Sequence, residues 1–75
     1  MKKLIISLSS ITTVKEFVET VTMCDYEIDL VSGRYIIDAK SIMGIFSLDL
    51  SKPIELIAHT ENAQELFKKF EKFTV

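Results

Sequence analysis

Apolar residues recur at two different spacings along this chain, and the alternation between them limits the fold more than any other feature. Leu4, Ile6 and Leu8 lie two apart, which predicts a strand over residues 3–8 with one buried face. From Ile11 the spacing changes to three and four residues, which indicates a helix with one apolar face. The residues of this helical face are Ile11, Val14, Phe17, Val18 and Val21.

The start of this first helix has several residues suited to capping. Thr13 and Glu16 are spaced as a capping box, in which two side chains satisfy free backbone N–H groups. Ser9 and Ser10 lie directly before the helical spacing begins and also suit the cap region. The sequence therefore leaves the identity of the cap residue open among these positions.

The middle of the chain has the pattern of a β-hairpin followed by a short helix. Two alternating apolar runs flank Ser32-Gly33, as is typical of a hairpin with antiparallel strands. Ser41 is a good cap residue for a helix that we expect to end near residues 48–50. The alternating runs are Tyr26, Ile28, Leu30 and Tyr35, Ile37, Ala39, and the apolar residues of the helix are Ile42, Met43, Ile45 and Phe46.

A last strand and a last helix complete the pattern. Pro53 is tolerated at the start of a strand in which Ile54, Leu56 and Ala58 share one face. Asn62 is the predicted cap of a final helix whose apolar stripe is Ala63, Leu66, Phe67, Phe70 and Phe73. The order is βαββαβα, and residues 1–75 are long enough for only one core. We therefore predict a single α+β domain with its helices on one face of one sheet.

Charge and cysteine content restrict the location and partners of such a domain. Nine basic and eleven acidic residues are interleaved along the chain, so we expect no direct binding of nucleic acid. Cys24 is the only cysteine and cannot form an internal disulfide, which favours the reducing cytoplasm. No segment approaches the roughly 20 apolar residues of a membrane span, so we expect no membrane insertion.

Residues that could support catalysis are few and scattered. Glu27 and Asp29 form a possible carboxylate pair, but we interpret them as residues on the solvent-exposed face of a sheet that is covered on one side only. His59 has no clear carboxylate partner nearby in sequence, and Cys24 has no histidine placed to activate it. The two glycines stand apart, and one cysteine with one histidine matches no common metal site. The sequence predicts a protein that is not an enzyme and that holds no metal or cofactor.

The stretch at residues 39–48, Ala-Lys-Ser-Ile-Met-Gly-Ile-Phe-Ser-Leu, carries a family resemblance. In a βαββαβα chain it resembles HPr, the phosphocarrier of the bacterial sugar phosphotransferase system, in the form found in Gram-positive bacteria. The resemblance implies an open-faced sandwich with a four-stranded antiparallel sheet. It also implies that Ser41 is a regulatory phosphorylation site for an ATP-dependent HPr kinase, and that Ile42, Met43 and Phe46 dock partner proteins. The alternative is that Ser41 is only a cap and that Ile42 and Ile45 belong to the core.

The chain departs from the HPr pattern at the start of the first helix. The family carries Gly-Leu-His-Ala-Arg-Pro-Ala there and phosphorylates the histidine. Alignment through Phe17-Val18 places Ser10 at the histidine, Thr12 at the arginine and Thr13 at the proline. A phosphoramidate on imidazole is a high-energy donor and a serine phosphate ester is not, so Ser10 cannot replace the histidine as a relay.

The resemblance and the departure together predict an HPr-like regulatory or protein-binding module without histidine phosphotransfer, switched at Ser41. Relatives that lack the histidine but keep the serine act in carbon catabolite control, as corepressors of a LacI-type transcription regulator. The partners implied for this chain are therefore HPr kinase and such a regulator. Two alternatives stay open, namely a working phosphocarrier whose histidine function has moved and a degenerate HPr-fold binding protein.

Overall fold

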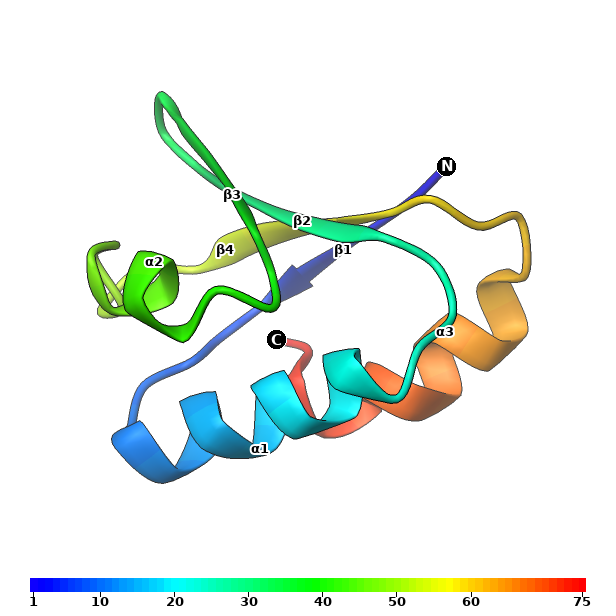
Figure 1. The fold of residues 1–75 in the computed structure, drawn as a ribbon, viewed down its shortest axis with the longest axis horizontal. Coiled ribbons are helices and arrows are strands. Elements are labelled where there is room, and N and C mark those ends of the chain that lie inside the picture. The colour runs from blue at the N-terminus through cyan, green and yellow to red at the C-terminus, as the bar shows by residue number, and fades with distance from the viewer.

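The computed structural model describes residues 1–75 and confirms the βαββαβα order. The four strands form one sheet in the order β1-β4-β2-β3, and every neighbouring pair is antiparallel. In Figure 1 the sheet is one layer, α1 and α3 lie beneath the same face, and α2 lies near the end where α1 begins. The elements are β1 (Lys2–Ile6), α1 (Ile11–Thr22), β2 (Ile28–Ser32), β3 (Tyr35–Asp38), α2 (Ile42–Phe46), β4 (Ile54–Ala58), α3 (Ala63–Phe70) and a 3₁₀ turn (Glu71–Phe73).

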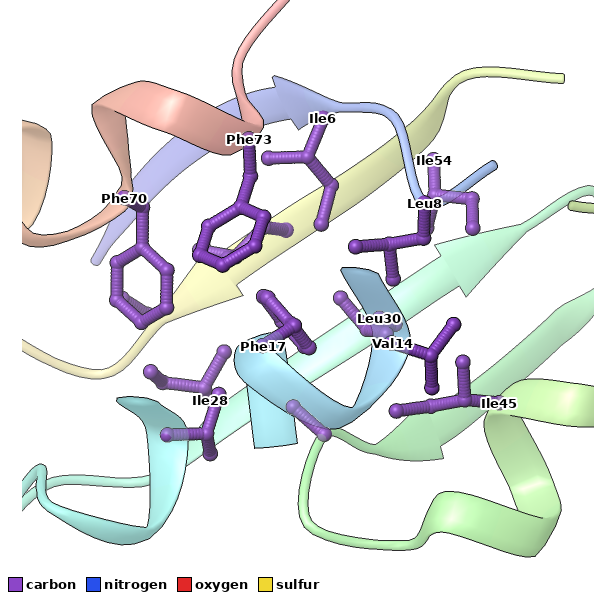
Figure 2. Close-up of a cluster of buried hydrophobic side chains, with 14 of the residues drawn as sticks. Ile6, Leu8, Val14, Phe17, Ile28, Leu30, Ile45, Ile54, Phe70 and Phe73 are labelled. Atoms are coloured by element: carbon purple, nitrogen blue, oxygen red, sulfur yellow. The ribbon is translucent and has the colours of Figure 1, made fainter. Parts of the chain in front are cut away.

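The core fills the space between the inner face of the sheet and the helices. All 17 buried residues are apolar or cysteine, and they form one cluster (Figure 2). Alternate strand residues such as Ile6, Leu30 and Leu56 point into it, as the period-two pattern predicted. The opposite face of the sheet is not covered by a helix (Figure 1). None of the helices is long and apolar enough to cross a bilayer.

Three phenylalanines from α1, α3 and the turn after α3 pack together at the centre of the core. The Phe17 ring lies 5.6 Å from the Phe70 ring and 5.4 Å from the Phe73 ring, the latter edge-to-face. The prediction that Phe67 also belongs to the buried stripe is wrong, because its side chain is 48% exposed. Successive helical residues are about 100° apart, so Phe67 falls at the flank when Leu66 and Phe70 face inward.

Two element boundaries and one capping motif differ from the predictions. β1 ends at Ile6 because its partner β4 begins at Ile54, directly opposite. α2 ends at Phe46, earlier than expected, because the Ser47 hydroxyl donates to the Gly44 carbonyl at 2.6 Å and the chain turns away. The capping box at residues 13 and 16 is also wrong, since the first helical residue is Ile11 and the cap lies before it.

The hairpin turn lies one residue later in the chain than the predicted break at Ser32-Gly33. Ser32 pairs directly with Tyr35, so the loop consists of Gly33 and Arg34 alone. Gly33 has φ +59° and no other residue has positive φ, which fits a II′ turn with glycine at its first position. This turn fixes the direction in which Arg34 and Tyr35 leave the sheet.

Tyr26 carries a buried hydroxyl that has no hydrogen-bond partner. Burial raises the pKa of Tyr26, and the neighbouring Cys24 thiol raises it further, so the phenol stays protonated. We expect Tyr26→Phe to raise the free energy of unfolding by about 1 kcal/mol, because it removes an unsatisfied polar group. Urea denaturation followed by circular dichroism measures this, with Tyr35→Phe at an exposed site as the control. A loss of stability in Tyr26→Phe would show that the hydroxyl is bonded.

Candidate functional site at the start of the first two helices

Ser10, which the sequence alignment predicts to stand at the position of the HPr histidine, caps α1. Its side-chain oxygen accepts a hydrogen bond from the Thr13 N–H at 3.1 Å, and the two hydroxyl oxygens lie 2.8 Å apart. The first turn of α1 holds no acidic residue. Ser10 and Thr12 are both exposed. The site therefore offers an exposed hydroxyl at a helix start, but neither an imidazole nor a guanidinium group.

Ser41 caps α2, as the sequence predicted. Its side-chain oxygen accepts from the Gly44 N–H at 3.2 Å, and its own N–H donates to the Asp38 carbonyl at 3.0 Å. The Asp38 carboxylate accepts from the Lys40 N–H at 2.9 Å, so this one residue holds the turn that leads into the helix. The Ser41 residue is exposed, and the Lys40 ammonium forms no ion pair. The hydroxyl is thus exposed in a fixed position, one residue after a lysine that forms no ion pair.

The apolar residues of α2 divide between the core and the surface. Ile45 is fully buried and Ile42 is half-buried, which agrees with a role of this helix in the core. Met43 is 77% exposed and Phe46 is 40% exposed. Two of the three predicted docking residues are therefore accessible, and the third lies at the boundary of the core.

Ile11 adds an exposed apolar side chain that the sequence pattern placed in the buried stripe of α1. It is 64% exposed, because it is the first residue of the helix and extends past the covered core. α1 and α2 contact each other, and Val14 and Ile45 lie close together in Figure 2. The exposed apolar residues at the start of α1 and on the outside of α2 therefore belong to neighbouring helices.

His59 has a carboxylate partner that the sequence did not reveal. Its Nε2 atom lies 3.0 Å from Oδ2 of Asp29, on the neighbouring strand. β1 pairs with Ala58 at its start and with Ile54 at its end, so His59 and Ser10 lie at opposite ends of the sheet. His59 is therefore not placed to take over a relay at the start of α1.

Comparison with known proteins decides the family. A model described as the phosphotransferase system HPr component phosphorylation site matches residues 12–74. The chain belongs to the HPr family. Its fold matches HPr-C-His from Thermoanaerobacter tengcongensis with a TM-score of 0.79 and 26% identity, over 96% of this chain and 89% of that one. HPr from Bacillus anthracis str. Ames shares the fold, with a TM-score of 0.76, 23% identity and coverage of 99% and 94%. A search of curated proteins found no match.

HPr proteins are phosphocarriers and not enzymes, which agrees with the absence of a catalytic constellation from the sequence. The family match begins at Thr12, so Ser10 lies outside the matched residues. The only histidine of the chain is His59. The chain is thus an HPr family member in which no histidine occupies the start of α1.

Gly44 is coupled to the Ser41 cap of this HPr chain. Alanine normally stabilises a helix by about 1 kcal/mol over glycine. A Cβ at Gly44 would lie 3.0 Å from the Ser41 Oγ and 3.4 Å from Ile37 Cδ1, so the serine side chain must shift by a few tenths of an ångström, which weakens its cap bond. We expect Gly44→Ala to give no gain in stability, but a gain of about 1 kcal/mol in a Ser41→Gly background. Urea denaturation of the four proteins tests this, and equal effects in both backgrounds would contradict the coupling.

Proposed function

We propose that this chain is a regulatory, protein-binding member of the HPr family that relays no phosphate through a histidine and is switched by phosphorylation at Ser41. The observation that carries the proposal is the contrast between its two helix starts. Ser41 is exposed, as a modification site requires, and follows Lys40, whereas the residue that we align with the family's histidine is Ser10, the cap of α1. The protein acts in the cytoplasm, where its single cysteine stays reduced.

Phosphorylation would change the surface around Ser41 strongly. A phosphate adds between one and two negative charges near neutral pH together with three acceptor oxygens. Lys40 is adjacent in sequence and has no competing ion pair, and the exposed Met43 lies two residues further along the helix. The modification thus places charge next to an exposed apolar residue and alters which partners α2 can bind.

The partners are proposed from the HPr resemblance together with these residues. HPr kinase is the proposed source of phosphate, and a LacI-type catabolite regulator is the proposed reader of the modified form. Ile42, Met43 and Phe46 are the proposed docking residues, of which Met43 and Phe46 are the most accessible. A regulator that binds this face must cover apolar surface and pair with charge at Ser41.

Two incubations test the proposal. The first contains the full chain with HPr kinase and ATP, and the second contains it with phosphoenolpyruvate and enzyme I. Mass spectrometry then locates any phosphate. We expect one phosphate at Ser41 in the first mixture, none in a Ser41→Ala variant, and full labelling of Ser47→Ala, whose serine lies at the other end of α2.

Two other labelling results would each support a different function, and a binding assay tests the docking face. Acid-labile phosphate from the second mixture would contradict the proposal and support a working phosphocarrier. No phosphate from either mixture would support a binding protein that keeps only the fold. Binding of the phosphorylated chain to an immobilised LacI-type regulator, lost on Met43→Asp, would support the docking face.

A further inference from the structure

An open groove of about 340 Å³ lies away from the starts of α1 and α2. One wall is the hairpin turn between β2 and β3, and the other is the connection from the end of α2 to β4. Its size is at the lower end of the range for small-molecule sites, roughly 300–1,000 Å³. The larger side chains that line it are Arg34, Tyr35, Leu48, Asp49, Lys52 and Pro53.

The hairpin wall supplies a free cation. Arg34 is exposed and forms no hydrogen bond or ion pair within the chain. The two-residue turn, fixed by Gly33 at φ +59°, holds it at the rim of the groove. A guanidinium group matches the geometry of carboxylate and phosphate oxygens through two parallel N–H donors.

The opposite wall supplies a second cation, Lys52, whose nearest carboxylate, Asp49, is already hydrogen-bonded to Ser51. Oδ1 of Asp49 accepts from the Ser51 hydroxyl at 2.5 Å and from the Ser51 N–H at 3.1 Å. These bonds hold the pKa of Asp49 below its usual value, so the carboxylate stays ionised. Lys52 reaches Asp49 only at 3.9 Å, with both side chains more than half exposed, and such a pair is weak. Lys52 can therefore turn toward an anion in the groove.

The lining of the groove also offers apolar contacts. The Tyr35 side chain is 70% exposed, although it lies at the start of a strand, and Pro53 forms part of the opposite wall. Leu48 also lines the groove and is buried. A ring or short apolar body between Tyr35 and Pro53 would remove both from water, which free inorganic anions cannot do.

We infer that this groove binds a small organic anion, with its carboxylate or phosphate group on Arg34 and Lys52 and its apolar body against Tyr35 and Pro53. The site is separate from Ser41 and from the proposed docking residues. It includes Ser47, which caps the end of α2, so a bound ligand contacts the segment that follows the docking helix.

An NMR titration of the full chain tests the inference with three probes: phenyl phosphate, benzoate and inorganic phosphate. We expect saturable amide shifts confined to residues 32–35 and 47–53, with phenyl phosphate and benzoate binding more tightly than inorganic phosphate. Loss of one charge-assisted contact predicts about tenfold weaker binding in Arg34→Gln. Lys68→Gln removes an exposed cation on α3 and should leave binding unchanged.

Four results would overturn the inference. The first is the absence of saturation by any probe, and the second is unchanged affinity in Arg34→Gln. The third is equal affinity for inorganic phosphate and phenyl phosphate, because the apolar wall would then contribute nothing. The fourth is a set of shifts centred on Ser10 and Ser41, which would place the anion at the helix starts. Arg34 lies in an exposed turn, so its variant should keep the dispersed spectrum of a folded protein.

Discussion

Replacing Phe17 with alanine is expected to lower the free energy of unfolding by about 3–5 kcal/mol. The Phe17 ring is fully buried and contacts both Phe70 and Phe73, so its removal leaves a cavity that three elements share. The free energy of unfolding of a native protein is only about 5–15 kcal/mol, so this single change removes a large part of the stability. Urea denaturation followed by far-ultraviolet circular dichroism gives the value.

Phe67→Ala is the matched control for this prediction. Phe67 is the same residue type on the helix that carries Phe70, but its ring is about half exposed. We expect Phe67→Ala to lower the free energy of unfolding by well under half as much as Phe17→Ala does. Equal losses at the two positions would show that the core does not centre on the three buried rings.

A double change, Ser10→His with Thr12→Arg, is expected to create an acceptor for phosphate from phosphoenolpyruvate and enzyme I. The two substitutions restore the imidazole and the charged partner at positions that are exposed at the start of α1. An arginine contact to a charged group contributes about 1.5–3 kcal/mol, so the single Ser10→His variant should accept phosphate at least about tenfold more slowly. The unchanged chain should accept none.

Acid-labile phosphate, measured over time by mass spectrometry, checks this result. Thr12→Arg alone is the control, because it adds the charge without the nucleophile. A double variant that stays unlabelled would contradict the prediction that the missing imidazole and guanidinium groups are what prevents phosphotransfer. Acid-labile labelling of the unchanged chain would show that it accepts phosphate without a histidine at Ser10.

The element order was predictable because strands and helices differ in the period of their apolar residues. The caps Ser41 and Asn62 were predictable because a cap bond is local. It joins the cap side chain to the backbone N–H three residues later, so it does not depend on the tertiary fold. Ile11 and Phe67 were placed in the core wrongly, since apolar spacing does not show where the covering surface stops. The packing of each helix against the sheet decides which of its apolar residues are buried, and the sequence of the helix alone does not show this.

Contacts between distant residues could not be predicted from the sequence. The Asp29–His59 pair depends on the register of β2 with β4, which places Asp29 opposite Ile57 and beside the end of that strand. The groove likewise needs the hairpin turn to meet the loop before β4. The sequence limited the cap of α1 to a few residues but did not identify Ser10, because three nearby hydroxyl residues, Ser9, Ser10 and Thr13, suit the same role.

The position of β4 in the sheet has a consequence for how the chain is made. β1 is synthesised first, yet its only partner in the sheet is β4, which also separates it from β2. While the ribosome is still adding the residues before β4, only the hairpin and local helices can form, and β1 must wait unpaired. The whole sheet therefore assembles late, through contacts between distant segments that slow folding.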